Sequence, residues 1–145
     1  MLAQDLSLGR CLIAKLDHGL DIVSQIKDLA KKEKIEVGIF SAIGALMQVE
    51  FAFYDQVSHE YHEIPIDEPM ELVSCSGNIS IRDNQPFVHA HAALADSEGR
   101  VWGGHLIGGK VFAAELCIQE LLGEPLIRNY DSITGLYLWD KRENV

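Results

Sequence analysis

Long apolar runs, cysteine pairs and basic clusters are all scarce in this 145-residue sequence. No apolar run reaches the roughly 20 residues that a membrane-spanning helix needs, so we expect no membrane partner. The first ten residues also lack the basic, apolar and small-residue zones of a secretory signal peptide. These absences predict a soluble, cytoplasmic protein.

The three cysteines, Cys11, Cys75 and Cys117, are odd in number and widely spaced. An odd count argues against a disulfide framework, and the lack of a Cys-x-x-Cys pair argues against a thiolate metal site. Each cysteine lies in an apolar, strand-like run. We therefore interpret all three as reduced core cysteines.

Positive charge is also in short supply, because 12 Lys and Arg residues face 22 Asp and Glu residues, a net charge of −10. No basic run is longer than Lys31-Lys32-Glu33-Lys34. A polyanion such as DNA would be repelled on average, so contact with it would need a local basic patch or a separate basic arm. The sequence has neither on its face, so direct DNA binding by this domain is doubtful.

The length of the chain fits one domain, residues 1–145, whose core is large enough to fold without disulfides or metal. A bound metal would therefore not be required for folding. Gly and Pro recur at short intervals along the chain, as they do in antiparallel β structure.

One helix is predicted after Asp21, where an acidic residue favours the helix dipole and lysines cluster at the far end. Its apolar positions recur at helical spacing: Ile22, Val23, Ile26, Leu29 and Ala30. The predicted strands are 11–16, 36–46, 49–54, 58–64, 70–81, 87–95, 100–106 and 111–118, with hairpin turns at 83–86 and 96–99. The fold class is α+β, a mostly antiparallel sheet or open barrel with one principal helix packed on it.

Three histidines form the main candidate site. His89 and His91 lie two apart on one predicted strand, so their side chains leave the same face. His105 follows after a predicted hairpin turn, which can carry it back beside the pair. Three imidazoles with an open fourth position are typical of a zinc ion that binds water, whereas closed structural sites usually recruit cysteines. The same spacing also suits two surface histidines and one core histidine.

Glycines flank the third histidine at positions 103, 104, 108 and 109. They allow close approach of other groups in a crowded pocket, and they equally suit a plain bend. Glu115 and Glu71 are weaker candidates, either as partners of a histidine or as acid–base groups. We find no nucleophile elbow, P-loop or dinucleotide fingerprint.

The sequence resembles the plants and prokaryotes conserved (PPC) domain, also called DUF296. The specific part of the resemblance is His89-Ala90-His91 followed by Gly103-Gly104-His105-Leu106, with Gly108, Val111 and Glu115 after it. Weaker matches begin at Arg10-Cys11-Leu12 and include 17–19, 41–45 and 71–79, so the resemblance covers nearly the whole chain and ends near Ile118.

The resemblance implies a compact α+β fold assembled as a homotrimer. Single-domain prokaryotic members can hold zinc through three histidines, which correspond here to His89, His91 and His105. Similar plant domains follow AT-hooks, and the family is often labelled DNA-binding for that reason. This chain has no AT-hook, and residues 68–73 match the plant partner-contact hexapeptide Gly-Arg-Phe-Glu-Ile-Leu without its Arg and Phe.

Two functions follow as hypotheses. The first is a homotrimeric zinc-binding module with a regulatory or DNA-associated role. The second is an enzyme that uses a zinc-activated water on a small-molecule substrate. The sequence assigns no general base, so it leaves open whether the chain is an enzyme and which small molecule would reach the metal.

Overall fold

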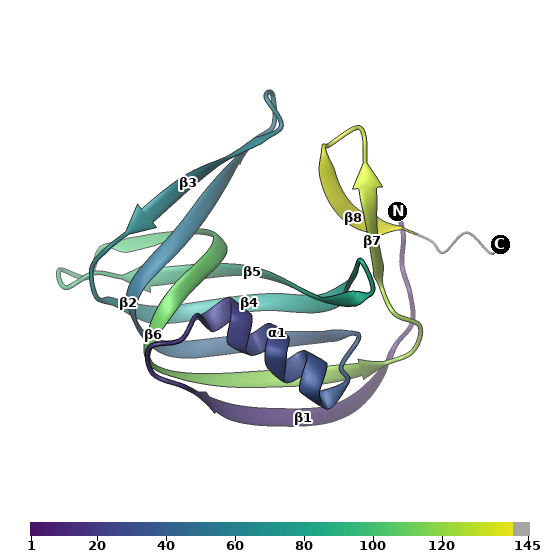
Figure 1. Ribbon diagram of the computed structural model, residues 1–145, viewed down its shortest axis with the longest axis horizontal. Coiled ribbons are helices and arrows are strands. Elements are labelled where there is room, and N and C mark those ends of the chain that lie inside the picture. Colours follow the sequence, from purple (N-terminus) through teal and green to yellow (C-terminus); the bar gives the residue numbers. More distant parts are fainter. Residues whose placement is uncertain (141–145) are drawn as a thin grey trace.

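The structure, a computed structural model, describes residues 1–140 (Figure 1). It contains one α-helix and eight strands within that range. The elements in chain order are β1 (Ser7–Leu16), α1 (Ile22–Glu33), β2 (Gly38–Asp55), β3 (Glu60–Ile66), β4 (Met70–Arg82), β5 (Gln85–Ala95), β6 (Val101–Leu122), β7 (Ile127–Asp131) and β8 (Leu136–Asp140). The predicted single domain extends into residues 141–145, which lie outside the described residues.

All eight strands belong to one sheet, in the order β3-β2-β6-β5-β4-β7-β8, with β1 paired to β6. Every pairing is antiparallel except one short parallel contact between β4 and β7. The prediction of a mostly antiparallel sheet with one principal helix is confirmed. β2 also pairs with β4, which folds the sheet back on itself, but the strands do not close into a barrel. The open-barrel alternative is therefore only loosely supported.

Two pairs of predicted strands are in fact single long strands. The predicted strands 36–46 and 49–54 both fall in β2 from residue 38 onward, and the predicted strands 100–106 and 111–118 both fall in β6 from residue 101 onward. Glycine bends these strands without ending them. Gly44 has a φ of +143° at a register shift, and a Cβ there would lie 2.2 Å from the carbonyl oxygen of Ala113. The bulge lets β2 run past the bend while it stays paired with β4 and β6.

The sequence prediction missed β7 and β8. These strands form a short hairpin whose turn is closed by Asp131, which accepts hydrogen bonds from the backbone and hydroxyl of Thr134. In Figure 1 this hairpin and the β2–β3 hairpin both rise from the sheet on the side away from α1. They frame the part of the sheet that carries the histidines.

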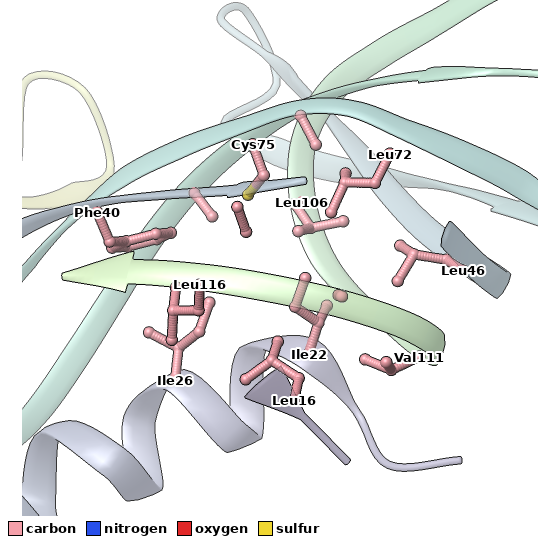
Figure 2. Close-up of a cluster of buried hydrophobic side chains, with 14 of the residues drawn as sticks. Leu16, Ile22, Ile26, Phe40, Leu46, Leu72, Cys75, Leu106, Val111 and Leu116 are labelled. Atoms are coloured by element: carbon pink, nitrogen blue, oxygen red, sulfur yellow. The ribbon is translucent and has the colours of Figure 1, made fainter. Parts of the chain in front are cut away.

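The helix begins after Asp21, as the sequence predicts, and lysines lie in its last turn. Asp21 caps its first turn by accepting a hydrogen bond from the backbone of Ser24 at 2.7 Å, and Lys34 ends it in the left-handed region. Ile22, Ile26 and Ala30 are fully buried against the sheet. Figure 2 shows Ile26 pointing towards Leu116 of β6, within one core that holds most of the buried side chains.

The cysteines differ in their environments. Cys75 is buried in the core, as predicted, whereas Cys11 is exposed and Cys117 is half-buried. The prediction of a core residue was wrong for Cys11 because it faces outward on β1, where only alternate side chains point to the core. Within residues 1–140, no helix has the length and apolar character needed to cross a membrane.

Candidate metal centre

The structure brings the three predicted histidines together on β5 and β6. His91 lies directly opposite His105 in the antiparallel pairing, and His89 lies two residues before His91 on the same face. The ring centroids are 5.2 Å apart for His89 and His91, 5.2 Å for His89 and His105, and 5.4 Å for His91 and His105. The hairpin between β5 and β6 therefore makes one three-imidazole cluster.

The glycines before His105 bring β6 close to its neighbour. A Cβ at Gly103 would lie 2.7 Å from the carbonyl oxygen of Ala92 on β5, which is too close for any side chain. A Cβ at Gly104 would have ordinary contacts only, the nearest at 3.6 Å. Close approach, rather than an unusual backbone angle, is therefore the reason for glycine at position 103.

Burial keeps two of the imidazoles neutral. The pKa of His89 is lowered from 6.5 to about 4, first by burial, then by the positive charge of Arg128, and then by the other two histidines. The pKa of His105 is also lowered, by burial, by His91 and by Arg128. A metal binds the neutral imidazole, so these two ligands need not lose a proton at neutral pH.

The donor set fits a metal ion. One ring nitrogen from each histidine can be chosen so that all three lie within 4.8 Å of one another. Tetrahedral zinc, with bonds of about 2.0–2.1 Å to nitrogen, would hold them about 3.3 Å apart. Binding would require the rings to rotate inward to bridge that difference. Because the chain supplies three nitrogens here, a tetrahedral ion would keep one position for another ligand.

Two hairpins lie beside the cluster. Tyr61 of β3 stacks on His105 with the ring centroids 5.4 Å apart. Its neighbour Tyr54 donates a hydrogen bond of 2.5 Å to the carbonyl oxygen of Thr134, in the β7–β8 turn. The β2–β3 and β7–β8 hairpins therefore touch each other, and Tyr61 covers one side of His105, whereas His91 is exposed.

A cavity of about 340 Å³ lies between these hairpins and the cluster. His89 and His105 form part of its wall, together with Tyr61, Arg82 and Arg128. A larger cavity of about 620 Å³ lies beside Asp21, Gln48 and Gly108, but it contains none of the clustered histidines. We therefore place the candidate site in the smaller cavity, where metal donors and open space coincide.

Sequence reasoning did not find the two arginines of this wall. Arg82 ends β4, just before a hairpin turn, and Arg128 lies in β7, which was not predicted. The signal for Arg128 was a single cation in the otherwise uncharged run Leu126-Ile127-Arg128-Asn129-Tyr130, which suggests a partly buried strand. Nothing in the sequence alone connects it to the histidines.

The two candidate glutamates lie at other positions of the sheet. Glu115 is paired with Lys15 of β1 and Ile43 of β2, and Glu71 is paired with Ala45 and Ala95. Neither belongs to the group of donor atoms formed by the three histidines. Their role as partners or as acid–base groups stays a prediction.

Fold and site together define a small β-sheet protein with one covering helix and a three-histidine cluster beside a cavity. The Plants and Prokaryotes Conserved (PCC) domain matches residues 4–122, and the chain belongs to this family. The resemblance drawn from the histidine and glycine motifs is thereby confirmed.

Solved structures share the fold over almost the whole chain. The metal-containing protein AF0104 from Archaeoglobus fulgidus is 38% identical, with a TM-score of 0.94, and the match covers 97% of this chain and 100% of that one. A PPC protein from Pyrococcus horikoshii is 40% identical, with a TM-score of 0.92 and 99% of each chain covered. A Ralstonia eutropha JMP134 protein with a provisional DNA-binding name is 25% identical, with a TM-score of 0.79 and coverage of 89% and 90%.

A curated relative is much longer than this chain. The bifunctional protein GlmU from Synechococcus sp. (strain JA-3-3Ab) is 30% identical over 124 residues, which are 83% of this chain but 19% of that protein. The chain thus spans about a fifth of the length of the curated relatives it matches.

Proposed function

We propose that this chain is a zinc-binding PPC module in which His89, His91 and His105 hold one ion and the fourth position is left to water or a small molecule. The observation that carries the proposal is the convergence of three ring nitrogens within 4.8 Å at the edge of a cavity. An all-imidazole donor set favours zinc among the common ions. The metal in the Archaeoglobus fulgidus protein supports a metal ion in this chain.

The ion would serve binding or regulation rather than folding. The chain has a contiguous core that includes α1 and most of the sheet and does not include the three histidines. Removing the metal should therefore leave the fold intact. A catalytic role is the second candidate, and the open position beside the cavity favours it, because zinc lowers the pKa of a bound water to about 7.

We propose that the module assembles as a homotrimer through the sheet face opposite α1. Three isoleucines lie exposed on this face, Ile13 at 75%, Ile39 at 53% and Ile43 at 56%. Exposed apolar side chains gathered on one face are typical of an interface between chains. Ile39 is paired with Asn78, and Asn78 with His89, so the histidines lie on the same face. Assembly through it would bring a neighbouring chain towards the metal.

Association with DNA is the weaker part of the proposed role. The provisional name of the Ralstonia eutropha protein supports it, whereas the net charge of −10 opposes it. A reducing, cytoplasmic location accords with three cysteines that are free thiols in the structure.

Native mass spectrometry tests the zinc site. We expect about one zinc per chain in the wild type and none in the double variant His89→Ala plus His91→Ala. His59→Ala plus His62→Ala is the matched control, since these histidines lie outside the cluster and should leave the zinc content unchanged. Circular dichroism should show that all the variants are folded. Zinc retained by the first double variant would overturn the proposal.

A further inference from the structure

We propose that the cavity beside His89 and His105 binds a small organic acid. Its carboxylate is held by Arg82 and Arg128, while an oxygen outside the carboxylate reaches the metal. The metal contact rests on the function proposed above, whereas the carboxylate contact stands without it. Three observations carry the proposal: a pair of cations on one aromatic ring, a wall without acidic residues, and the size of the cavity.

The first observation is the pair of guanidinium groups. The guanidinium carbons of Arg82 and Arg128 lie 5.7 Å and 5.0 Å from the centre of the same Phe87 ring. Arg128 donates its hydrogen bonds to three neutral oxygens: the Ser80 hydroxyl, the Asn78 amide and the Tyr137 carbonyl. These bonds fix its orientation without neutralising its charge. An anion between the two arginines would relieve their mutual repulsion.

Arg82 has one ion-pair partner within the described residues. Its Nε atom is buried and lies 3.5 Å from a carboxylate oxygen of Asp83, whose side chain is 85% exposed, and this contact is not a hydrogen bond. Because the Nε atom is buried, a ligand carboxylate would meet the terminal guanidinium nitrogens of Arg82 instead.

Aromatic packing explains where the arginines lie but not their charge. Arg82 lies 3.5 Å from the centre of the Tyr137 ring, and Arg128 lies 5.6 Å from that of Trp139. Such contacts stabilise a cation on a ring face. None of the described residues that line the cavity is acidic, and the carboxylate that pairs with Arg82, that of Asp83, lies outside this wall.

The size and the remaining wall indicate the ligand class. A cavity of about 340 Å³ lies at the small end of ligand pockets, and it exceeds what a single ion needs. Its wall includes the apolar side chains of Phe87, Leu136 and Leu138, which suit a short hydrocarbon part. Arginine guanidinium groups match a carboxylate in a bidentate geometry. A small acid with an apolar tail and a second oxygen fits all of these features.

Calorimetric titration of the zinc-loaded protein tests the proposal, with 2-hydroxy-4-methylpentanoate as the probe. We expect binding that is weakened about tenfold or more by Arg82→Gln and partly restored by Arg82→Lys, since loss of a charge-assisted hydrogen bond has that effect. Lys27→Gln, which removes an exposed charge from α1, is the matched control and should bind like the wild type.

Three further ligands separate the parts of the proposal in the wild-type protein, whatever the stability of the variants. The amide of the probe should bind at least tenfold more weakly, because it lacks the negative charge. The analogue 4-methylpentanoate lacks the hydroxyl oxygen that would reach the metal, so its affinity should not change when zinc is removed. Equal affinity for acid and amide would overturn the carboxylate site, and tighter binding of inorganic phosphate would overturn the organic-acid class.

The same titrations distinguish this proposal from the zinc proposal. A wild-type protein that contains no zinc, yet binds the probe in a manner that depends on Arg82, would overturn the zinc function and support the carboxylate site. If the protein holds zinc but the wild type and Arg82→Gln bind the probe equally well, the carboxylate site would be overturned and the zinc function supported.

Discussion

At the scale of single residues, Asp96 holds the turn that returns His105 to His91. Its carboxylate accepts hydrogen bonds from the backbones of Glu98 and Arg100, at 2.9 and 3.0 Å, and from the side chain of Arg100 at 2.7 Å. The indole of Trp102 makes a longer contact of 3.4 Å. These bonds favour the ionised form of Asp96, so the turn between β5 and β6 depends on one negative charge.

The pH dependence of stability should report this charge. The Arg100 hydrogen bond, with smaller contributions from the other donors, lowers the pKa of Asp96 from 3.8 to about 2. A lowered pKa in the folded state stabilises the protein above the unfolded pKa, and the effect is lost as the pH falls from about 4 to about 2. Asp96→Asn should therefore lower the urea midpoint at pH 6, and its difference from the wild type should shrink below pH 4.

Asp83→Asn is the control for this experiment. Asp83 lies in the neighbouring hairpin turn with a positive φ, which asparagine tolerates, so its midpoint should follow that of the wild type at every pH. A difference between wild type and Asp96→Asn that stays constant from pH 6 to pH 2 would contradict the role assigned to the carboxylate.

At the scale of elements, the sequence predicted the parts of the site that local spacing controls. The two-residue period of a strand places His89 and His91 on one face, and the turn at 96–99 returns the chain towards them. Spacing could not show that β2 and β6 continue through their glycines, because a glycine can either end a strand or bend it. It also could not place Arg128 at the site, because the β4–β7 contact, between residues distant in the chain, brings it there.

Gly77 tests how tightly these elements pack. A Cβ at this position of β4 would lie 2.1 Å from the carbonyl oxygen of His89 and 2.4 Å from the ring of Phe40. Backbone on one side and a core ring on the other leave little room to adjust. Gly77→Ala should therefore lower the free energy of unfolding by about 1–3 kcal/mol, as overpacking does. Urea denaturation of the wild type and the variant measures this difference in the free energy of unfolding.

Gly104→Ala provides the matched comparison, because a Cβ there has its nearest contact at 3.6 Å. This variant should be within about 0.5 kcal/mol of the wild type, the usual range for an unstrained change. Equal losses of stability in the two variants would contradict the packing described for β4 and β5.

At the scale of the whole molecule, the two faces of the sheet have different roles. One face is covered by α1 and forms the core, and the other carries the histidines, the two framing hairpins and the exposed isoleucines. A domain of this size needs no metal for its core, so the second face is free to serve binding. The proposed trimer and the proposed metal site both use it.

Light scattering after size-exclusion chromatography tests the assembly. We expect a trimer for the wild type and a smaller species for Ile39→Glu plus Ile43→Glu, because two charges would be buried in the interface without partners. Ile133→Glu changes another exposed isoleucine, in the β7–β8 turn, and it should remain trimeric. A wild-type monomer, or a trimer unaffected by the double substitution, would contradict this use of the sheet face.

An anomalous difference map of a crystal measured at the zinc edge tests most directly whether one zinc ion lies between His89, His91 and His105. We expect one strong peak per chain, about 2.0–2.1 Å from a nitrogen of each ring, with a fourth ligand on the cavity side. A map from zinc-replete protein with no peak at these histidines, or with its peak at other residues, would contradict the proposed zinc site.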